Sequence, residues 1–236
     1  MDLAFPEKFY SGHQVIKFKG KELQGKIDAE PDYYLRQGKQ LLLIEHKDVL
    51  ISEIKKQETD VSMMIDALSD KICREKDEKK GRKGGPQLLY TIDGIFKRES
   101  MQHLDSDAKK ANLVYPVVTV LDSAFSSLGV ALATVRKFCE QAQGYDTIKE
   151  ELTHVAPITI IDIDTLIILS KRLHDGELDL FNLIGEYQRV LCTKSKDVYE
   201  QPSFSSFIAD NYSLKEIKEE DNGFLLSNYY EEITGM

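Results

Sequence analysis

The sequence predicts an α/β fold: a β-meander, then helices and further strands, then a mainly helical C-terminal part. Residues 13–51 consist of short apolar runs divided by polar turns, as in a meander. From about residue 58 the apolar residues recur at three- and four-residue steps, which is typical of amphipathic helices. Two later runs, 112–121 and 154–162, are apolar and β-branched and predict additional buried strands.

The meander is expected to contain three strands. HQVIKFKG (13–20) predicts the first, and a polar turn follows near residues 20–22. LQGKIDAEPDYYL (23–35) predicts the second and QLLLIEHKDVLI (40–51) the third. Pro31 cannot donate a ladder hydrogen bond, so we expect the second strand to be bulged or at an edge there.

The helices are predicted from their apolar stripes and their breakers. A stripe from Val61 to Ile72 predicts a helix over 58–74, which a basic stretch and Gly84-Gly85-Pro86 interrupt before a second helix begins near Gln87. Further helices are expected over 127–143 and, with Asp164 as N-cap and an end near Gly176, over 165–173. Three aromatic-rich runs complete the helical part: 181–191, 202–212 and 225–233.

Length and composition restrict the class of protein. A chain of 236 residues is one large domain or one domain with an appendage, and we place a soft boundary at 150, between parts 1–150 and 151–236. Three scattered cysteines (Cys73, Cys139 and Cys192) argue against a disulfide framework or a structural zinc. The N-terminus does not resemble a signal peptide, and no apolar run is long enough to span a bilayer. We therefore expect a soluble cytoplasmic protein.

The charge is acidic overall and basic in one place. The net charge of −9 speaks against a protein whose whole surface binds nucleic acid, but a local basic patch is still compatible with it. Residues 71–83, KICREKDEKKGRK, form such a patch. They are equally well interpreted as a solvated loop or as an arm that contacts DNA or RNA. The candidate nucleic-acid-binding residues are Lys79, Lys80, Arg82 and Lys83.

The turn between the second and third strands brings charged residues together. If Gly38-Lys39 is a two-residue turn of type II′, Gln37 pairs with Gln40, and counting outward Asp32 lies opposite Glu45. Alternation then puts Glu30, Asp32, Glu45 and Lys47 on one face and His46 on the other. A longer turn is also allowed, and with an odd number of residues it would turn the two carboxylates to opposite faces.

Two neighbouring carboxylates repel each other unless a cation lies between them. Mg²⁺ or Mn²⁺ is the natural occupant of such an oxygen site. Lys47 could orient or help to deprotonate a water molecule, and the metal would stabilise negative charge on a phosphate. We expect His46 to have a structural role or to face a phosphate, because its side chain points away from Asp32.

Pro31-Asp32, followed by Glu45-His46-Lys47 at the end of an apolar strand, resembles the signature of the PD-(D/E)xK nuclease superfamily, in a RecB-like, prokaryotic branch. The resemblance implies a restriction-endonuclease-like core of meander, helix and further strand in a mixed sheet flanked by helices. The helix at 58–74 would be an insertion, and 151–236 a helical subdomain packed on that core.

The resemblance also implies roles for individual residues. Asp32 and Glu45 would bind the Mg²⁺ or Mn²⁺, with the backbone carbonyl of His46 assisting, and Lys47 would be the catalytic lysine. Gln87 matches a glutamine that RecB-like members carry on the following helix, and Tyr90 and Glu30 are possible accessory residues.

The implied function is that of a metal-dependent nuclease in defence or repair. Its expected substrate is nucleic acid, with DNA as the first candidate. Its expected partners are nucleic acid and either a second copy of the chain or a larger complex, and no membrane. The alternative is a catalytically inactive nuclease-fold module that binds nucleic acid or a protein partner. The acidic net charge and the absence of room for a helix before the first strand favour this alternative.

Overall fold

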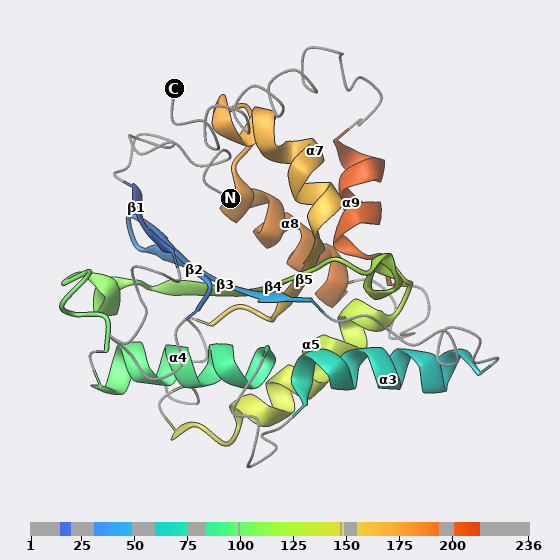
Figure 1. The fold of residues 1–236 in the computed structure, drawn as a ribbon, viewed down its shortest axis with the longest axis horizontal. Helices are drawn as coiled ribbons and strands as arrows, with labels where there is room; N and C mark the ends of the chain where they lie inside the picture. The colour runs from blue at the N-terminus through green and yellow to red at the C-terminus, as the bar shows by residue number, and fades with distance from the viewer. Residues whose placement is uncertain are drawn as a thin grey trace.

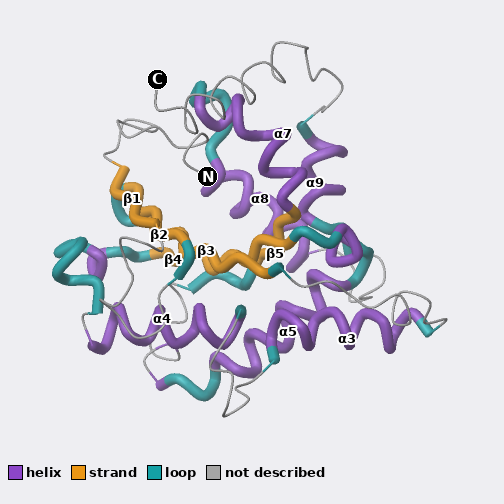
Figure 2. Tube along the Cα trace, in the orientation of Figure 1, coloured by secondary structure: helices purple, strands orange, loops and turns teal. Residues whose placement is uncertain are grey.

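The computed structural model describes residues 15–19, 31–48, 60–74, 84–98, 100–146, 148, 155–193 and 201–212. Within these ranges the chain forms an α/β fold with one five-stranded sheet, in the order β1-β2-β3-β4-β5 (Figure 2). The strands are β1 (Val15–Lys19), β2 (Tyr33–Gln37), β3 (Gln40–Lys47), β4 (Leu113–Val120) and β5 (Thr159–Asp162).

The sheet is mixed. β1, β2 and β3 pair antiparallel as the predicted meander, whereas β4 is parallel to β3 and β5 is parallel to β4. The two parallel connections require crossovers, which the helices between these strands provide. β5 follows the boundary expected at 150 and pairs with a strand that precedes it. That boundary stays a prediction.

The hairpin between β2 and β3 has the short turn considered above. Gln37 pairs with Gln40, and the pairing continues regularly to Tyr33 opposite Ile44. Gly38 has a φ of 59°, a left-handed conformation that costs glycine little and other residues more. The register that would place Asp32 beside Glu45 is therefore confirmed.

Helices cover both faces of the sheet (Figure 1). One layer contains α3 (Val61–Cys73), α4 (Gly85–Arg98) and α5 (Val130–Ala142). The opposite layer contains α7 (Ile163–His174), α8 (Leu180–Thr193) and α9 (Phe204–Asn211). Two short 3₁₀ helices, η2 (Ala108–Lys110) and η3 (Ser123–Ser126), lie before and after β4.

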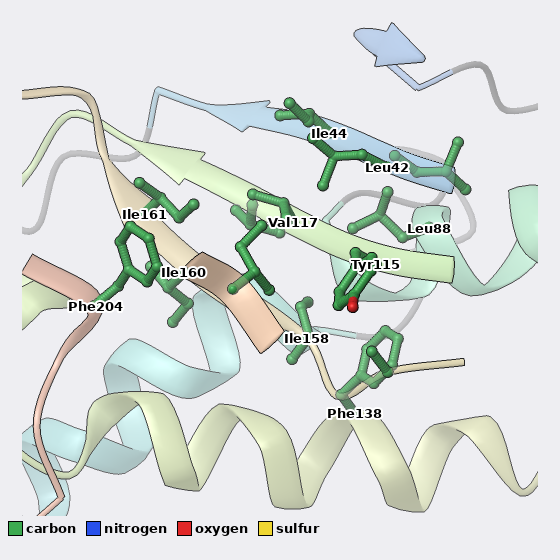
Figure 3. Packing of buried hydrophobic residues seen from close by; sticks show 14 of the residues in the cluster. Leu42, Ile44, Leu88, Tyr115, Val117, Phe138, Ile158, Ile160, Ile161 and Phe204 are labelled. Carbon is green, nitrogen blue, oxygen red and sulfur yellow. The ribbon is translucent and has the colours of Figure 1, made fainter. Parts of the chain in front are cut away.

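The core fills both spaces between the sheet and its helices. Leu42 and Ile44 of β3 and Tyr115 and Val117 of β4 are buried side chains of this core (Figure 3). Tyr115 packs edge-on against Phe181 of α8, at 5.8 Å between ring centroids. Because neighbours in the parallel register share a face, Leu42 faces α8 as well. The residues of β3 that alternate with Leu42 and Ile44, including Glu45 and Lys47, face the α3–α5 layer.

Several boundaries differ from the sequence prediction. Asp164 is not the N-cap of α7: Asp162 has that position, and its side chain accepts from the Thr165 amide. The reason is that β5 passes directly into the helix, so the first aspartate ends the strand and caps the helix at once. Pro31 is not part of the second strand, because β2 begins two residues after it, at Tyr33, between β1 and β3.

The remaining differences are small or fall outside the described residues. α3 is shorter than 58–74 by three residues at its start and one at its end, and α4 begins at Gly85, two residues before Gln87. The helix predicted over 225–233 and the N-terminal part of the second strand lie outside the described ranges. Cys73, Cys139 and Cys192 are free thiols. No described helix is long and apolar enough to cross a bilayer.

Candidate functional site

Glu45 and Lys47 form a buried ion pair at the C-terminal end of β3. Their side chains are next to each other because residues two apart in a strand share a face. Lys47 Nζ lies 3.1 Å from Glu45 Oε1. Glu45 is 5% exposed and Lys47 7%, values that are rare for charged residues without a specific role or partner.

Asp32 lies at the start of the hairpin, one residue before β2. The pairing of Tyr33 with Ile44 is the last of the β2–β3 register, and Asp32 and Glu45 are the next residues beyond it on the two strands. The Asp32 carboxylate is exposed, and its Oδ2 accepts a hydrogen bond from the His46 backbone N–H at 2.7 Å. This bond crosses from β2 to β3, holds the aspartate at the end of the hairpin and leaves its Oδ1 able to accept another ligand.

The Glu45 carboxylate is incompletely satisfied. Among the described residues no group hydrogen bonds to its buried Oε2. Burial, and to a smaller extent the charge of Asp32, raise the pKa of Glu45 to about 7, although Lys47 and the Gly84 backbone act in the opposite direction. Burial raises the pKa of a carboxylic acid because the charged form loses its hydration. A cation at Oε2 would supply the missing charge.

Gly84 brings the start of α4 against this pair. It has a φ of +65°, and a Cβ atom on it would lie 3.2 Å from Lys47 Cε and only 2.4 Å from the Ile72 carbonyl oxygen at the end of α3. Only glycine fits between these two elements without displacement. The N-terminal end of α4 therefore lies beside Lys47, at the carboxyl edge of the parallel strands, where ligands commonly bind in open α/β sheets.

Gln87 and Tyr90 follow on the first two turns of α4, and both are partly exposed. Gln87 is only three residues beyond Gly84, so the structure brings it to the same end of the helix. Tyr90 lies one turn further along, where the Arg98 guanidinium stacks over its ring at 4.1 Å from the centroid. Tyr90 thus belongs to a separate contact along α4.

The His46 side chain is on the other face, as the alternation predicted. Its Nδ1 lies 3.1 Å from Thr119 Oγ1 of β4. Only its backbone contacts the cluster, through the N–H bound to Asp32. In the part of the chain that the structure describes, no group of three or more His, Cys, Asp or Glu side chains could hold a metal ion. The candidate donors are thus the two carboxylates and a backbone carbonyl.

Some predicted site residues lie outside the described ranges: Glu30 and the four basic residues Lys79, Lys80, Arg82 and Lys83. The basic segment connects α3 to Gly84. The described residues on its two sides therefore belong to α3 and to the start of α4, the elements around the candidate site. Two hollows lined by described residues have volumes of about 950 Å³, between α3 and α5, and about 500 Å³, beside α8. Neither is lined by Asp32, Glu45, Lys47 or Gln87.

Sequence reasoning missed two features near the site. Gly84 was interpreted only as a helix break, although a glycine pair directly before a helix is also compatible with close approach of another element. The second feature is a buried charged cluster on β2: Arg36 is hydrogen bonded to both carboxylate oxygens of Asp105, and Tyr34 donates to Asp105 Oδ2 at 2.7 Å. The alternating YYLRQ pattern alone did not indicate that partner, which lies 69 residues away.

Comparison with known proteins gives no match: no family model, no curated protein and no solved structure is similar to this chain.

Proposed function

We propose that this protein is a Mg²⁺- or Mn²⁺-dependent nuclease with a PD-(D/E)xK core, and that Asp32, Glu45 and Lys47 are its catalytic residues. The observation that carries the proposal is the buried Oε2 of Glu45, to which no described residue hydrogen bonds, with Lys47 beside it and Asp32 bound to the neighbouring His46 amide. A chain that folds a charged pair into its core and leaves one carboxylate oxygen unsatisfied has a site suited to a cation.

The fold supports the same proposal. An antiparallel meander is followed by α4 and by β4, which is parallel to β3. This is the order of elements expected for a restriction-endonuclease-like core, with α3 as the inserted helix. The candidate residues lie at the carboxyl edge of the central strand, where Asp32 is exposed and Glu45 and Lys47 are buried directly behind it.

The donor set fits a hard divalent cation. Asp32 Oδ1, Glu45 Oε2 and the His46 carbonyl are all oxygen donors, the ligands that Mg²⁺ and Mn²⁺ prefer. When bound, such an ion polarises a phosphate and stabilises the negative charge that develops on it. The third donor of the site is a main-chain group on the strand that carries Glu45, so its place is fixed by the sheet.

The remaining steps belong to side chains. Lys47 is held by Glu45 at 3.1 Å, and its ammonium can orient the attacking water and favour its deprotonated form. Asp32 is held by the His46 amide, so the two carboxylates are positioned before any substrate binds. Gln87, at the start of α4, is the candidate that would hydrogen bond a phosphate oxygen or the water. DNA is the first expected substrate.

The direct test is cleavage by the purified protein in Mn²⁺ of labelled single- and double-stranded DNA and of RNA. We expect cleavage of at least one substrate, and losses of about 10²-fold or more for Asp32→Asn and Lys47→Met. Asp48→Asn is a matched control, because Asp48 is an exposed residue directly after β3. Absence of cleavage of all substrates, or full activity in Asp32→Asn and Lys47→Met, would contradict the proposal.

One observation favours the alternative, an inactive nuclease-fold module. Lys47 already neutralises Glu45, and Asp32 already accepts a hydrogen bond, so the cluster is partly satisfied by the protein itself. Calorimetric titration with Mn²⁺ separates the two functions. A nuclease requires Mn²⁺ binding that depends on Asp32 and Glu45, whereas a module that binds nucleic acid or a protein requires no Mn²⁺ binding.

A further inference from the structure

Arg98, the last residue of α4, folds back along its own helix. Its Nη1 donates to the Tyr90 hydroxyl, and its Nη2 donates to the Tyr90 carbonyl oxygen at 3.3 Å. The guanidinium carbon Cζ lies over the ring, at 4.1 Å from the centroid. A cation stacked on a tyrosine ring is attracted to its face, and these contacts together hold one orientation of a long side chain.

Gly94 leaves room for the Arg98 side chain to fold back along α4. It lies midway between Tyr90 and Arg98, and a Cβ atom there would be 3.0 Å from Arg98 Nη2 and 3.0 Å from Ser100 Oγ. With alanine at this position, the guanidinium and the Ser100 hydroxyl would each have to move by a few tenths of an ångström. The spacing of three and four residues places Gln87, Tyr90, Gly94 and Arg98 along one side of α4.

The Arg98 charge has no acidic partner among the described residues. Three other described basic residues are paired with carboxylates: Arg36 with Asp105, Lys137 with Asp70 and Lys171 with Asp175. Arg98 instead has an aromatic partner, is exposed, and uses two of its five N–H donors on Tyr90. An exposed, oriented guanidinium with unused donors is suited to an oxyanion such as a phosphate.

We propose that the Tyr90–Gly94–Arg98 side of α4 binds a backbone phosphate of the nucleic-acid strand that is cut at Glu45 and Lys47. The inference rests on the proposed function and extends it to the path of the substrate. Five residues of helix separate Gly85, at the site, from Tyr90, which is about 7.5 Å at 1.5 Å per residue. This equals about two nucleotides of a stacked strand at 3.4 Å each.

The test is binding of a short fluorescein-labelled oligothymidylate, measured by anisotropy in EDTA over a series of salt concentrations. EDTA prevents cleavage, so the readout does not depend on activity. For Arg98→Ala we expect about tenfold weaker binding at low salt, and a salt slope that is smaller by roughly 0.7, the value of one phosphate contact on a single strand. Gly94→Ala is expected to fall between Arg98→Ala and the unmodified protein, because the new methyl group displaces the guanidinium.

Lys97→Ala is the matched control. Lys97 is the neighbouring exposed cation on α4, outside the stacked contact, and its loss is expected to weaken binding by about twofold or less. Equal effects of Arg98→Ala and Lys97→Ala would overturn the inference, as would an unchanged salt slope in Arg98→Ala. Thermal unfolding of each variant verifies that α4 is intact.

The two proposals fail in different ways. If the protein cuts the oligonucleotide in Mn²⁺ but Arg98→Ala binds and cuts as the unmodified protein does, the phosphate contact is wrong and the nuclease proposal stands. If binding depends on Arg98 but no substrate is cut, the nuclease proposal is wrong and the contact belongs to a nucleic-acid-binding module.

Discussion

Two buried ion pairs lie on the β2–β3 hairpin, and they differ in how completely their hydrogen bonds are made. Arg36 binds both oxygens of Asp105, which also accepts from the Tyr34 hydroxyl and the Asp107 backbone. Arg36 Nη1 donates to the Gly38 carbonyl at the turn as well. The Glu45–Lys47 pair, at the opposite end of the hairpin, has one hydrogen bond within the pair, and no other described residue hydrogen bonds to the buried Oε2 of Glu45.

The pKa values of the two acids move in opposite directions. Burial raises the pKa of Asp105, but hydrogen bonds from Arg36 and Tyr34 outweigh it and hold the pKa below its usual range. Burial also raises the pKa of Glu45, and there Lys47 and the Gly84 backbone do not compensate, so the value reaches about 7. A satisfied buried pair stabilises the fold, whereas an unsatisfied one is suited to bind something.

The largest expected effect separates activity from stability at Glu45. Glu45→Gln removes the carboxylate and, if the proposed function holds, is expected to lower nuclease activity by about 10³-fold, since several kcal/mol of charge stabilisation would depend on the ion that Glu45 is proposed to bind. The free energy of unfolding at pH 6, measured with urea, should change by only about 1 kcal/mol, because Glu45 is largely protonated there and Gln is nearly isosteric. Loss of both activity and several kcal/mol would assign Glu45 a structural role.

The second effect, at Asp105, is a loss of stability. Asp105→Ala leaves Arg36 buried without its partner and the Tyr34 hydroxyl without its acceptor, so we expect a loss of about 3–5 kcal/mol in the free energy of unfolding. Asp107→Ala, two residues away, should cost about 0.5 kcal/mol, because Asp107 pairs with the exposed Lys110 at the surface. Similar urea curves for the two variants would show that burial of the Arg36 pair contributes little.

The sequence was informative about the Glu45 pair and silent about the Arg36 pair for a physical reason. Glu45, Lys47 and Asp32 belong to one hairpin, so strand alternation and a two-residue turn are sufficient to bring them together. Asp105 lies in a connection before β4, and no local pattern predicts which strand it contacts. Local periodicity predicts neighbours within a hairpin but not pairs that form through the tertiary fold.

The same limit applies to helix ends. The strands and helices were predicted in the right order because their apolar periods are long, but the Asp162 cap was misplaced at Asp164. Either aspartate can cap a helix by its chemistry, and only the direct passage of β5 into α7 selects the first. The contact of Gly84 with Lys47 and Ile72 likewise depends on how α3 and α4 pack, which no local spacing specifies.

A third, smaller effect is the pH dependence of stability. The pKa of Glu45 is about 7 in the folded chain and has its ordinary value of 4.5 in the unfolded chain, so the folded state binds more protons between these pH values. The stabilisation is therefore complete below about pH 4.5 and is lost as the pH rises through 7. We expect it to be on the order of 2–3 kcal/mol. The difference in unfolding free energy between the unmodified protein and Glu45→Gln should decrease from pH 5 to pH 8, and a constant difference would contradict the raised pKa.

The smallest effect compares the glycines that accompany the two pairs. Gly38, whose carbonyl accepts from Arg36, has a left-handed φ of 59°, so Gly38→Ala should cost about 1–2 kcal/mol and leave nuclease activity unchanged. Gly38→Asn should recover part of this loss, since asparagine tolerates the left-handed region. Gly84→Ala has the same conformational cost and in addition places a methyl group 2.4 Å from the Ile72 oxygen and against Lys47. It should therefore lower stability more than Gly38→Ala does, and it should lower cleavage as well. Equal behaviour of the two variants in urea unfolding and in cleavage would mean that the close approach of α4 to Lys47 has no role in the site.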